Sequence, residues 1–280
     1  MLHRHLYLPE QITVTHGPTR FIGRFVLEAY ETARRLGYLL SWNSDMRELQ
    51  RFNRANLATW FPLMTLFDPD FSPVDEGNSG WVEARDHGGE IVAAIAVRVL
   101  EWPAGANFKS ETEAGRVFVG TPGDGEEWRV TAPSAEAIVG RLLYPGALWI
   151  RPDHRHRELG YLLCHLAIVL GWTLWSPDFA ASIIQLHAVE RGVAHRYGLC
   201  HVERAVHCRN SPRLGDRDMV LAWVPRGEFR AVIEAFRDQE LMSTASEPLA
   251  TLRTTERRVA IGLPSSSAEA RRVHGRISRS

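Results

Sequence analysis

The most regular apolar pattern in the chain lies near its middle, where a short apolar run, a basic turn and a long apolar run follow one another. The first run, Ala147–Ile150, is too short for a helix and predicts a buried strand that Pro152 ends. Apolar residues then dominate from Leu159 to Trp175, which predicts a buried helix and falls short of the about 20 residues that span a bilayer. The pattern therefore predicts a strand, a basic turn and a helix in that order.

Apolar periodicity before this unit predicts a helical N-terminal flank, residues 1–77. Apolar positions four apart predict one helix over Phe21–Leu40. A second helix is predicted over Ser44–Trp60, with Asp45 or Ser44 as its N-cap.

Runs of β-forming residues on either side of the central unit predict the rest of a sheet. The runs at 80–85 and 91–102 flank the Gly-rich turn Asp86–Glu90, so together they predict a hairpin. Further strands are predicted over residues 12–14, 181–188, 202–208 and 219–224, and further helices over 134–143, 189–197 and 228–241.

The basic turn before the long helix has the composition of an anion site. The first-turn amides of a helix have no partner within the helix, and they lie at the positive end of its dipole. Gly160 allows a ligand to approach the backbone closely, and Arg155 and Arg157 add planar donors that suit phosphate oxygens. These residues predict a pyrophosphate site, and a solvated basic turn in front of a buried helix is the alternative.

The segment Pro152–Leu163 resembles the acyl-CoA-binding motif of the GNAT acetyltransferase superfamily. In that motif a strand is followed by Arg or Gln, two residues, Gly, one residue, and Gly or Ala. Arg155 takes the first position and Gly160 the last, whereas Glu158 replaces the middle glycine. An acidic side chain there either points outward or repels the pyrophosphate. The resemblance extends over roughly residues 78 to 225, because the order of the flanking elements also follows the family.

The resemblance implies an α/β fold of the α+β type. Its centre is a GNAT-like mixed, mostly antiparallel sheet flanked by helices, with an N-terminal helical extension. The implied core, 78–225, contains an insertion at about 103–143 and is followed by a helix at 226–241. Residues 242–280 then form a disordered basic tail, in which arginines outnumber acidic residues.

The resemblance also implies acyl-CoA-dependent N-acyl transfer. Acetyl-CoA, or another acyl-CoA, is the implied co-substrate, and the acceptor is an amine of a small molecule or protein that attacks the thioester directly in a ternary complex. The backbone of the motif strand would pair with the pantetheine arm, and the amides of the turn would hold the pyrophosphate. The residues implied in cofactor binding are Trp149, Ile150, Arg155, His156, Arg157, Glu158, Leu159, Gly160 and Tyr161.

Four residues are candidates for proton transfer. Glu83 and His187 stand at predicted strand positions and are candidate bases for the acceptor amine. The family often carries a tyrosine that protonates the departing thiolate, four residues before a glycine that corresponds to Gly198. That position holds Ala194, and the neighbouring His195 and Tyr197 are candidate acids.

Two other functions stay open. Glu158 and Ala194 favour a degenerate GNAT fold that acts as a non-catalytic binding module, whereas Arg155 and Gly160 favour an enzyme. The helical N-terminal flank agrees with a longer-chain acyl-amino-acid or acyl-homoserine-lactone synthase on the same fold. The aromatic loop Trp60–Phe71 either packs in the core or lines an acceptor site.

Charge and cysteine content limit the classes of partner and site that the sequence predicts. The formal net charge is +0 and the pI is near 7.2, so neither nucleic acid nor a membrane is expected as a partner. Cys164, Cys200 and Cys208 form no close pair, which favours a reducing, cytoplasmic setting. The spacing of His and Cys predicts no metal site. The oligomeric state is open, a homodimer included.

Overall fold

The computed structural model describes residues 7–117, 125–155, 158–190, 198–211 and 214–245. Contacts divide the chain into the units Met1–Glu240 and Leu241–Ser280, and the fold described below is that of the first unit.

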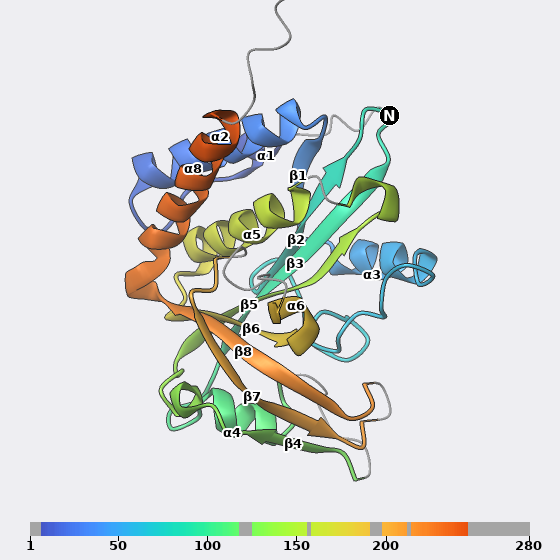
Figure 1. Ribbon diagram of the computed structural model, residues 1–280, viewed down its shortest axis with the longest axis vertical. Coiled ribbons are helices and arrows are strands. Elements are labelled where there is room, and N and C mark those ends of the chain that lie inside the picture. Colours follow the sequence, from blue (N-terminus) through green and yellow to red (C-terminus); the bar gives the residue numbers. More distant parts are fainter. Residues whose placement is uncertain (1–6, 118–124, 156–157, 191–197, 212–213, 246–280) are drawn as a thin grey trace, which may run out of the picture. The chain divides into compact units, whose positions relative to one another are not determined.

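A sheet of eight strands forms the centre of the fold, in the order β1-β2-β3-β5-β6-β8-β7-β4 (Figure 1). β5 and β6 pair in parallel, and the other neighbouring strands of the described residues pair antiparallel. The sheet is therefore mixed and mostly antiparallel, as the motif implied. The strands are β1 (Leu39–Asn43), β2 (Ser79–Arg85), β3 (Ile91–Glu101), β4 (Glu127–Val130), β5 (Arg141–Ile150), β6 (Phe179–Gln185), β7 (His201–Arg209) and β8 (Arg217–Pro225).

Apolar residues pack on both faces of the sheet, because successive strand residues point to opposite sides. In β2, Val82 and Ala84 join one buried cluster and Trp81 joins the other. The first cluster includes residues of α1, α2, α5 and α8, and the second includes residues of α3, α4 and the loop at 60–67. The helices are α1 (Leu8–Gln11), α2 (Thr19–Arg35), α3 (Met46–Ala55), α4 (Phe108–Glu113), α5 (Leu159–Trp175), α6 (Leu186–Glu190) and α8 (Phe229–Ala245).

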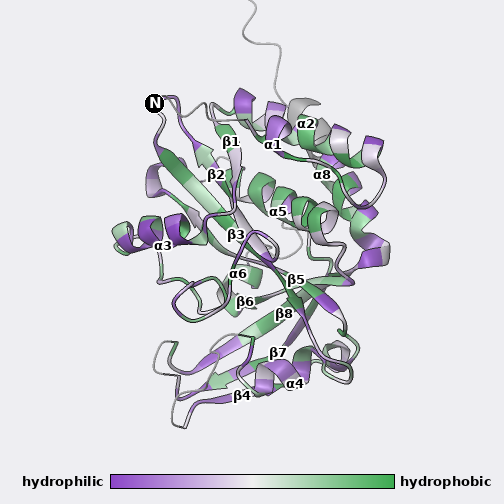
Figure 2. Cartoon of the chain, turned by 180° about the vertical axis from the view of Figure 1, so that it is seen from behind, coloured by the Kyte–Doolittle hydropathy of each residue, from purple (hydrophilic) through white to green (hydrophobic). Residues whose placement is uncertain are grey.

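Helix α5 is apolar along its whole length, whereas α3 is largely hydrophilic on the outside (Figure 2). All residues from Leu159 to Thr173 are buried, because α2 and α8 lie beside α5 and the sheet lies beneath it. Gly171 lets α5 approach the sheet closely, since a side chain there would overlap Leu143 of β5. The predicted buried helix is confirmed with its predicted bounds.

Several other predicted elements are confirmed. The hairpin is β2 and β3, the two C-terminal strands are β7 and β8, and the last helix is α8. Asp45 is the N-cap of α3, and its side chain accepts hydrogen bonds from the amides of Arg47 and Glu48. The helix ends at Ala55, five residues before the predicted end.

In the N-terminal flank a predicted helix is confirmed with a wrong end, and a predicted strand is wrong. The helix predicted over residues 21–40 ends at Arg35, Gly37 adopts a φ of 90°, and the chain then enters β1. β1 is a short edge strand whose conformation depends on pairing with β2, and its own periodicity does not reveal it. The strand predicted at 12–14 does not form, and the short helix α1 precedes this segment.

On either side of the motif a predicted helix is wrong, and a predicted strand is confirmed with a wrong end. The helix predicted over 134–143 is a 3₁₀ turn at Pro133–Glu136, after which β5 begins at Arg141. The strand predicted over 181–188 is β6, which ends at Gln185. Its last residue pairs with Met219 of β8, and the chain then turns into α6. The edge strand β4 was not predicted, and its pairing with β7 holds it in place.

Candidate functional site

The parallel strands β5 and β6 separate soon after they begin. Their pairing consists of Leu142 with Phe179 and Leu143 with Ala180. Both strands then continue, β5 along β3 and β6 along β8. Residues 146–148 and 182–184, beyond the last pair, are half-buried. Among the described residues no strand pairs with the β6-facing edge of β5 from residue 144 to residue 150.

A bulge bends β5 inside this split. Trp149 pairs with Ala94 and Gly146 pairs with Ala96, so β5 has one residue more than β3 over this stretch. Ala147 adopts a φ of 51°, in the left-handed region. A bulge of this kind re-aims the backbone and ends regular pairing. The open edge of β5 is thereby directed toward the turn that leads into α5.

The basic turn after β5 is fastened to the rest of the fold through Arg151 and His154. Arg151 forms ion pairs with Asp86 in the β2–β3 turn, at 3.2 Å, and with Asp153, at 2.9 Å. The His154 ring is buried, with Nε2 2.6 Å from Arg151 Nη2 and Nδ1 2.9 Å from the Tyr38 hydroxyl. These bonds fix the part of the turn that directly follows β5, Arg151 to His154.

The helix dipole and Arg155 make the start of α5 favourable for an anion, whereas Glu158 adds a negative charge there. Leu159 and Gly160 begin the helix, so their amides lie at its positive end. The Arg155 side chain is exposed next to this end, and its Nε donates to the carbonyl of Ile150 at 3.2 Å. Glu158 is the N-cap in a left-handed conformation, with a φ of 57°, and its side chain is exposed. His156 and Arg157 lie outside the described residues.

The predicted cofactor residues whose positions are described lie together in this region, although two of their side chains point elsewhere. Trp149 is buried on the α3 side of the sheet, where its ring stacks on Trp60 with centroids 5.4 Å apart and its Nε1 donates to Thr59. Tyr161 stacks on Phe236 of α8, with centroids 5.4 Å apart. Only the backbone of these two residues is in a position to contact a ligand in the split.

The loop that supplies Trp60 mostly packs in the core. Trp60, Leu63, Leu66 and Phe67 are buried, which agrees with the packing alternative. Phe61 and Phe71 are exceptions, because 83% and 54% of their surfaces are exposed.

Of the two candidate bases, Glu83 is held by other side chains. Glu83 is buried on β2; Arg85 donates to both of its carboxylate oxygens at 2.9 Å, and the Ser41 hydroxyl donates at 2.6 Å. Its hydrogen-bonding capacity is therefore used by the fold. His187 lies in α6, and its predicted strand position is wrong because β6 ends two residues earlier. The candidate acids His195 and Tyr197, together with Ala194, lie outside the described residues.

Tyr144 is a residue of the split that the sequence did not reveal. Its side chain is buried, and its hydroxyl accepts a hydrogen bond from the amide of Ile183 on β6 at 3.0 Å. Burial raises the pKa of Tyr144 to about 12, so the phenol stays protonated. In the sequence it is one aromatic residue in an apolar run, and nothing local marks it as a residue that crosses between two strands.

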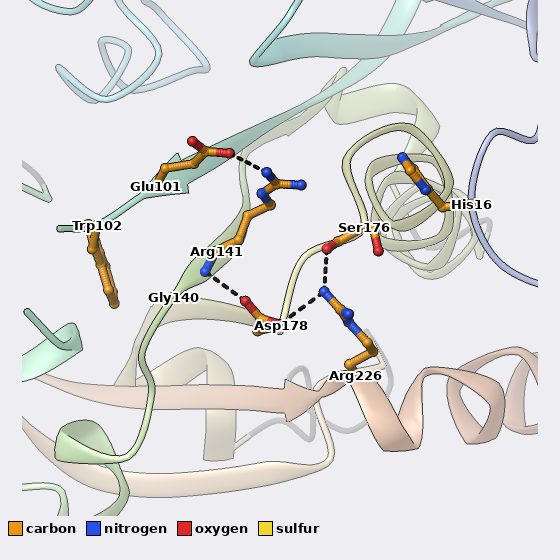
Figure 3. Close-up of a pocket in the computed structure, with 8 residues that line it drawn as sticks. All are labelled: His16, Glu101, Trp102, Gly140, Arg141, Ser176, Asp178 and Arg226. Atoms are coloured by element: carbon orange, nitrogen blue, oxygen red, sulfur yellow. Dashed lines mark hydrogen bonds and ion pairs between the residues drawn. The ribbon is translucent and has the colours of Figure 1, made fainter. Parts of the chain in front are cut away.

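A pocket of about 510 Å³ lies at the other end of β5, far along the strand from the basic turn (Figure 3). Asp178 at its centre accepts from the amide of Arg141 at 2.9 Å and pairs with Arg226 at 2.9 Å. Arg141 pairs with Glu101 at 2.6 Å and donates to the carbonyl of Trp175, the last residue of α5, at 2.7 Å. The bond to Trp175 supplies a partner for a backbone carbonyl at the end of α5, and the bond between Arg141 and Asp178 joins the starts of β5 and β6. These structural roles account for the polar lining of the pocket. A second hollow, of about 450 Å³, lies at the end of β6.

Three observations on the described residues concern other classes of site. They contain no group of three or more His, Cys, Asp or Glu side chains that could hold a metal ion. None of the helices in this part of the chain combines the length and the apolar character needed to cross a membrane. The three cysteines are free thiols, and Cys200 is the exposed one.

No family model and no curated protein matches the chain. Among solved structures it is similar to Arabidopsis thaliana NAA60 in complex with acetyl-CoA, with 13% identity over 66% of this chain and 98% of that chain, and a TM-score of 0.39. It is similar to a mutant of spermidine N-acetyltransferase from Vibrio cholerae, with 10% identity over 68% of this chain and 95% of that chain, and a TM-score of 0.39. It is also similar to the ribosomal-protein-S5-alanine acetyltransferase from Vibrio fischeri, with 10% identity over 69% of this chain and 95% of that chain, and a TM-score of 0.40.

The geometry of the chain itself contains a mostly antiparallel sheet, a parallel β5–α5–β6 unit whose strands separate, and helices on both faces. The chain therefore has a mixed α/β fold.

Proposed function

We propose that the chain is an acyl-CoA-dependent N-acyltransferase that moves an acyl group, in the first place acetyl, to an amine. The observation that carries this proposal is the open edge of β5, which is followed in the chain by the N-terminus of α5. A pantetheine arm carries two amides and needs backbone partners, and a pyrophosphate needs positive charge and N–H donors. The donor groups on this path fit both needs.

In the proposed complex the pantetheine arm lies along the β6-facing edge of β5, from Gly146 to Ile150, as an added strand. The pyrophosphate is held by the first turn of α5, with Arg155 as the nearby cation. The negative charge of Glu158 opposes this arrangement, because it repels the pyrophosphate. The thioester then lies in the split between β5 and β6, where a backbone amide of β5 can polarise its carbonyl.

The transfer step is direct. A neutral amine attacks the thioester carbon, the C–N bond forms, the C–S bond of the tetrahedral intermediate breaks, and the thiolate of CoA leaves. The amine proton passes to a base and the thiolate receives a proton from an acid. His187 is the proposed base, because Glu83 would first have to release Arg85. His195 and Tyr197 remain the proposed acids. Alignment of the two reactants supplies much of the rate.

The test is calorimetric titration with acetyl-CoA, followed by a thiol-release assay over a panel of small and peptide amines. Gly160→Trp blocks the start of α5, and Arg155→Glu reverses an exposed charge without touching the core. Gly227→Trp is the control, because a Cβ placed there has no heavy atom within 4 Å apart from its chain neighbours. We expect acetyl-CoA to bind to the wild type and to the control, and to bind much more weakly to the two site variants.

The other functions give different results in the same experiments. Binding of acetyl-CoA with no thiol release from any amine would favour a binding module. Release that is faster with long-chain acyl-CoA than with acetyl-CoA would favour the longer-chain synthase. If a folded wild-type protein bound no acyl-CoA, the proposal would be wrong.

A further inference from the structure

Tyr144 is the first residue of β5 beyond its pairing with β6. The last pair joins Leu143 to Ala180, and three residues later on β6 the amide of Ile183 donates to the Tyr144 hydroxyl at 3.0 Å. Ile183 faces Leu221 of β8 across its other edge. The hydrogen bond to Tyr144 shows that the Ile183 amide points toward β5, where a side chain satisfies it in place of a backbone carbonyl.

Because a side-chain hydroxyl and not a backbone carbonyl accepts from the Ile183 amide, the two strands can lie farther apart than a regular pair. Paired strands lie about 4.8 Å apart, because the carbonyl and amide groups are short. A tyrosine side chain is longer than a carbonyl group, so its hydroxyl can satisfy an amide of a strand that lies farther away. An amide buried without a partner is costly, so without the hydroxyl the Ile183 amide would favour closer approach to β5 or exposure to water.

The Tyr144 ring is held in one position by its neighbours. Its side chain is 1% exposed, and its centroid lies 6.2 Å from that of Phe67. Gly146 leaves room for both rings, since a Cβ there would lie 2.8 Å from Phe67 and 3.3 Å from Tyr144. The hydroxyl also interacts with the side chain of Ser182. A ring packed in this way acts as a rigid spacer.

We propose that Tyr144 is a positioning residue that determines where the β5–β6 split begins and how wide it is, and thereby leaves the β5 edge open for the pantetheine arm. The part that concerns pantetheine rests on the proposed function. The part that concerns the spacing of β5 and β6 rests on the hydrogen bond and the packing alone.

The test compares Tyr144→Phe with the wild type and with Thr173→Val. Tyr144→Phe removes the hydroxyl and keeps the ring. Thr173→Val removes another buried hydroxyl, which donates to the carbonyl of His16 at 3.3 Å, near the opposite end of α5 from the basic turn. NMR hydrogen exchange at the Ile183 amide reports the spacing, and calorimetric titration reports acetyl-CoA affinity.

In Tyr144→Phe we expect a changed exchange rate at Ile183, by about tenfold, and acetyl-CoA affinity weaker by about five- to tenfold, as the loss of one hydrogen bond implies. In Thr173→Val we expect both quantities to match the wild type, although thermal stability falls to a similar extent. Unchanged exchange at Ile183 in Tyr144→Phe would overturn the spacer role. Changed exchange with unchanged acetyl-CoA affinity would overturn its link to the pantetheine arm. Failure of the wild type to bind acyl-CoA would instead refute the proposed function, and the exchange result would still decide the spacer role.

Discussion

The hydroxyl of Tyr38 lies 2.9 Å from Nδ1 of His154, and both side chains are buried. Arg151 donates to Nε2 of the same ring at 2.6 Å, so Nδ1 carries the proton and donates it to Tyr38. One histidine of the basic turn is therefore a structural anchor, which joins the turn to the segment that leads into β1.

Loss of this anchor should loosen the turn. For Tyr38→Phe we expect the free energy of unfolding to fall by about 1 kcal/mol, because His154 loses a buried partner. Acetyl-CoA affinity should fall several-fold, because the turn also carries Arg155. Urea unfolding and calorimetric titration measure the two effects. A loss of stability with unchanged affinity would show that the turn has no part in binding.

Replacement of Glu158 by glycine should improve both stability and binding. A non-glycine residue at a φ of 57° costs about 1 kcal/mol, and glycine adopts this conformation freely. Glu158→Gly should therefore stabilise the fold by about that amount and tighten acetyl-CoA binding, because a negative charge leaves the proposed pyrophosphate site. Glu158→Gln is the matched control, which removes the charge and keeps the backbone strain. If the two variants bound acetyl-CoA no better than the wild type, Glu158 would not face the ligand.

The stacked pair Trp60 and Trp149 should be a large contributor to stability. Both rings are buried, and truncation of a buried aromatic residue to alanine typically costs about 3–5 kcal/mol. We expect Trp149→Ala to fall in this range, as measured by chemical denaturation. Thr59→Val removes only the acceptor of the Trp149 Nε1 hydrogen bond, and its cost should stay near 1 kcal/mol. Similar costs for the two variants would argue against the stack as the source of stability.

Replacement of Asp178 should lower the stability of the fold and leave acyl-CoA binding unchanged. It accepts from the amide of Arg141 and pairs with Arg226, so it joins the starts of β5 and β6 to the end of β8 (Figure 3). For Asp178→Ala we expect a loss of about 1–2 kcal/mol in the free energy of unfolding. Acetyl-CoA affinity should match the wild type, since the pocket lies at the opposite end of β5 from the basic turn. Weaker affinity in a fully folded variant would assign this pocket to the binding site.

His165 should make stability depend on pH. Burial in α5 lowers its pKa to about 4, against an ordinary value near 6.5 in the unfolded chain. As the pH falls below 6.5 the unfolded state takes up this proton first, so stability decreases between about pH 6.5 and about pH 4, by roughly 3 kcal/mol in all. Urea unfolding across this range should show a steeper decrease for the wild type than for His165→Gln, which lacks the titrating ring. Parallel curves would mean that the pKa of His165 is the same in the folded and the unfolded chain.

Local patterns in the sequence determined the elements that bury a continuous apolar surface. The bounds of α5 follow from an apolar run that has no polar side, and β2, β3, β7 and β8 follow from β-forming runs between turn residues. The Asp45 cap is equally local, because the side chain bonds amides two and three residues away. The cofactor site that the motif after β5 predicts remains a proposal, and the elements that would form it, β5 and α5, are confined to one stretch of the chain.

Tertiary structure alone decided the features that depend on residues far apart in the chain. β1 and β4 are edge strands that exist through their partners, and the parallel pair of β5 and β6 stops where the Tyr144 side chain reaches Ile183. Tertiary contacts also decide whether a candidate base is free to accept a proton. Arg85 and Ser41 both donate hydrogen bonds to the carboxylate of Glu83. Periodicity reports which side of an element is apolar, whereas strand pairing and side-chain partners are set by contacts that no local pattern encodes.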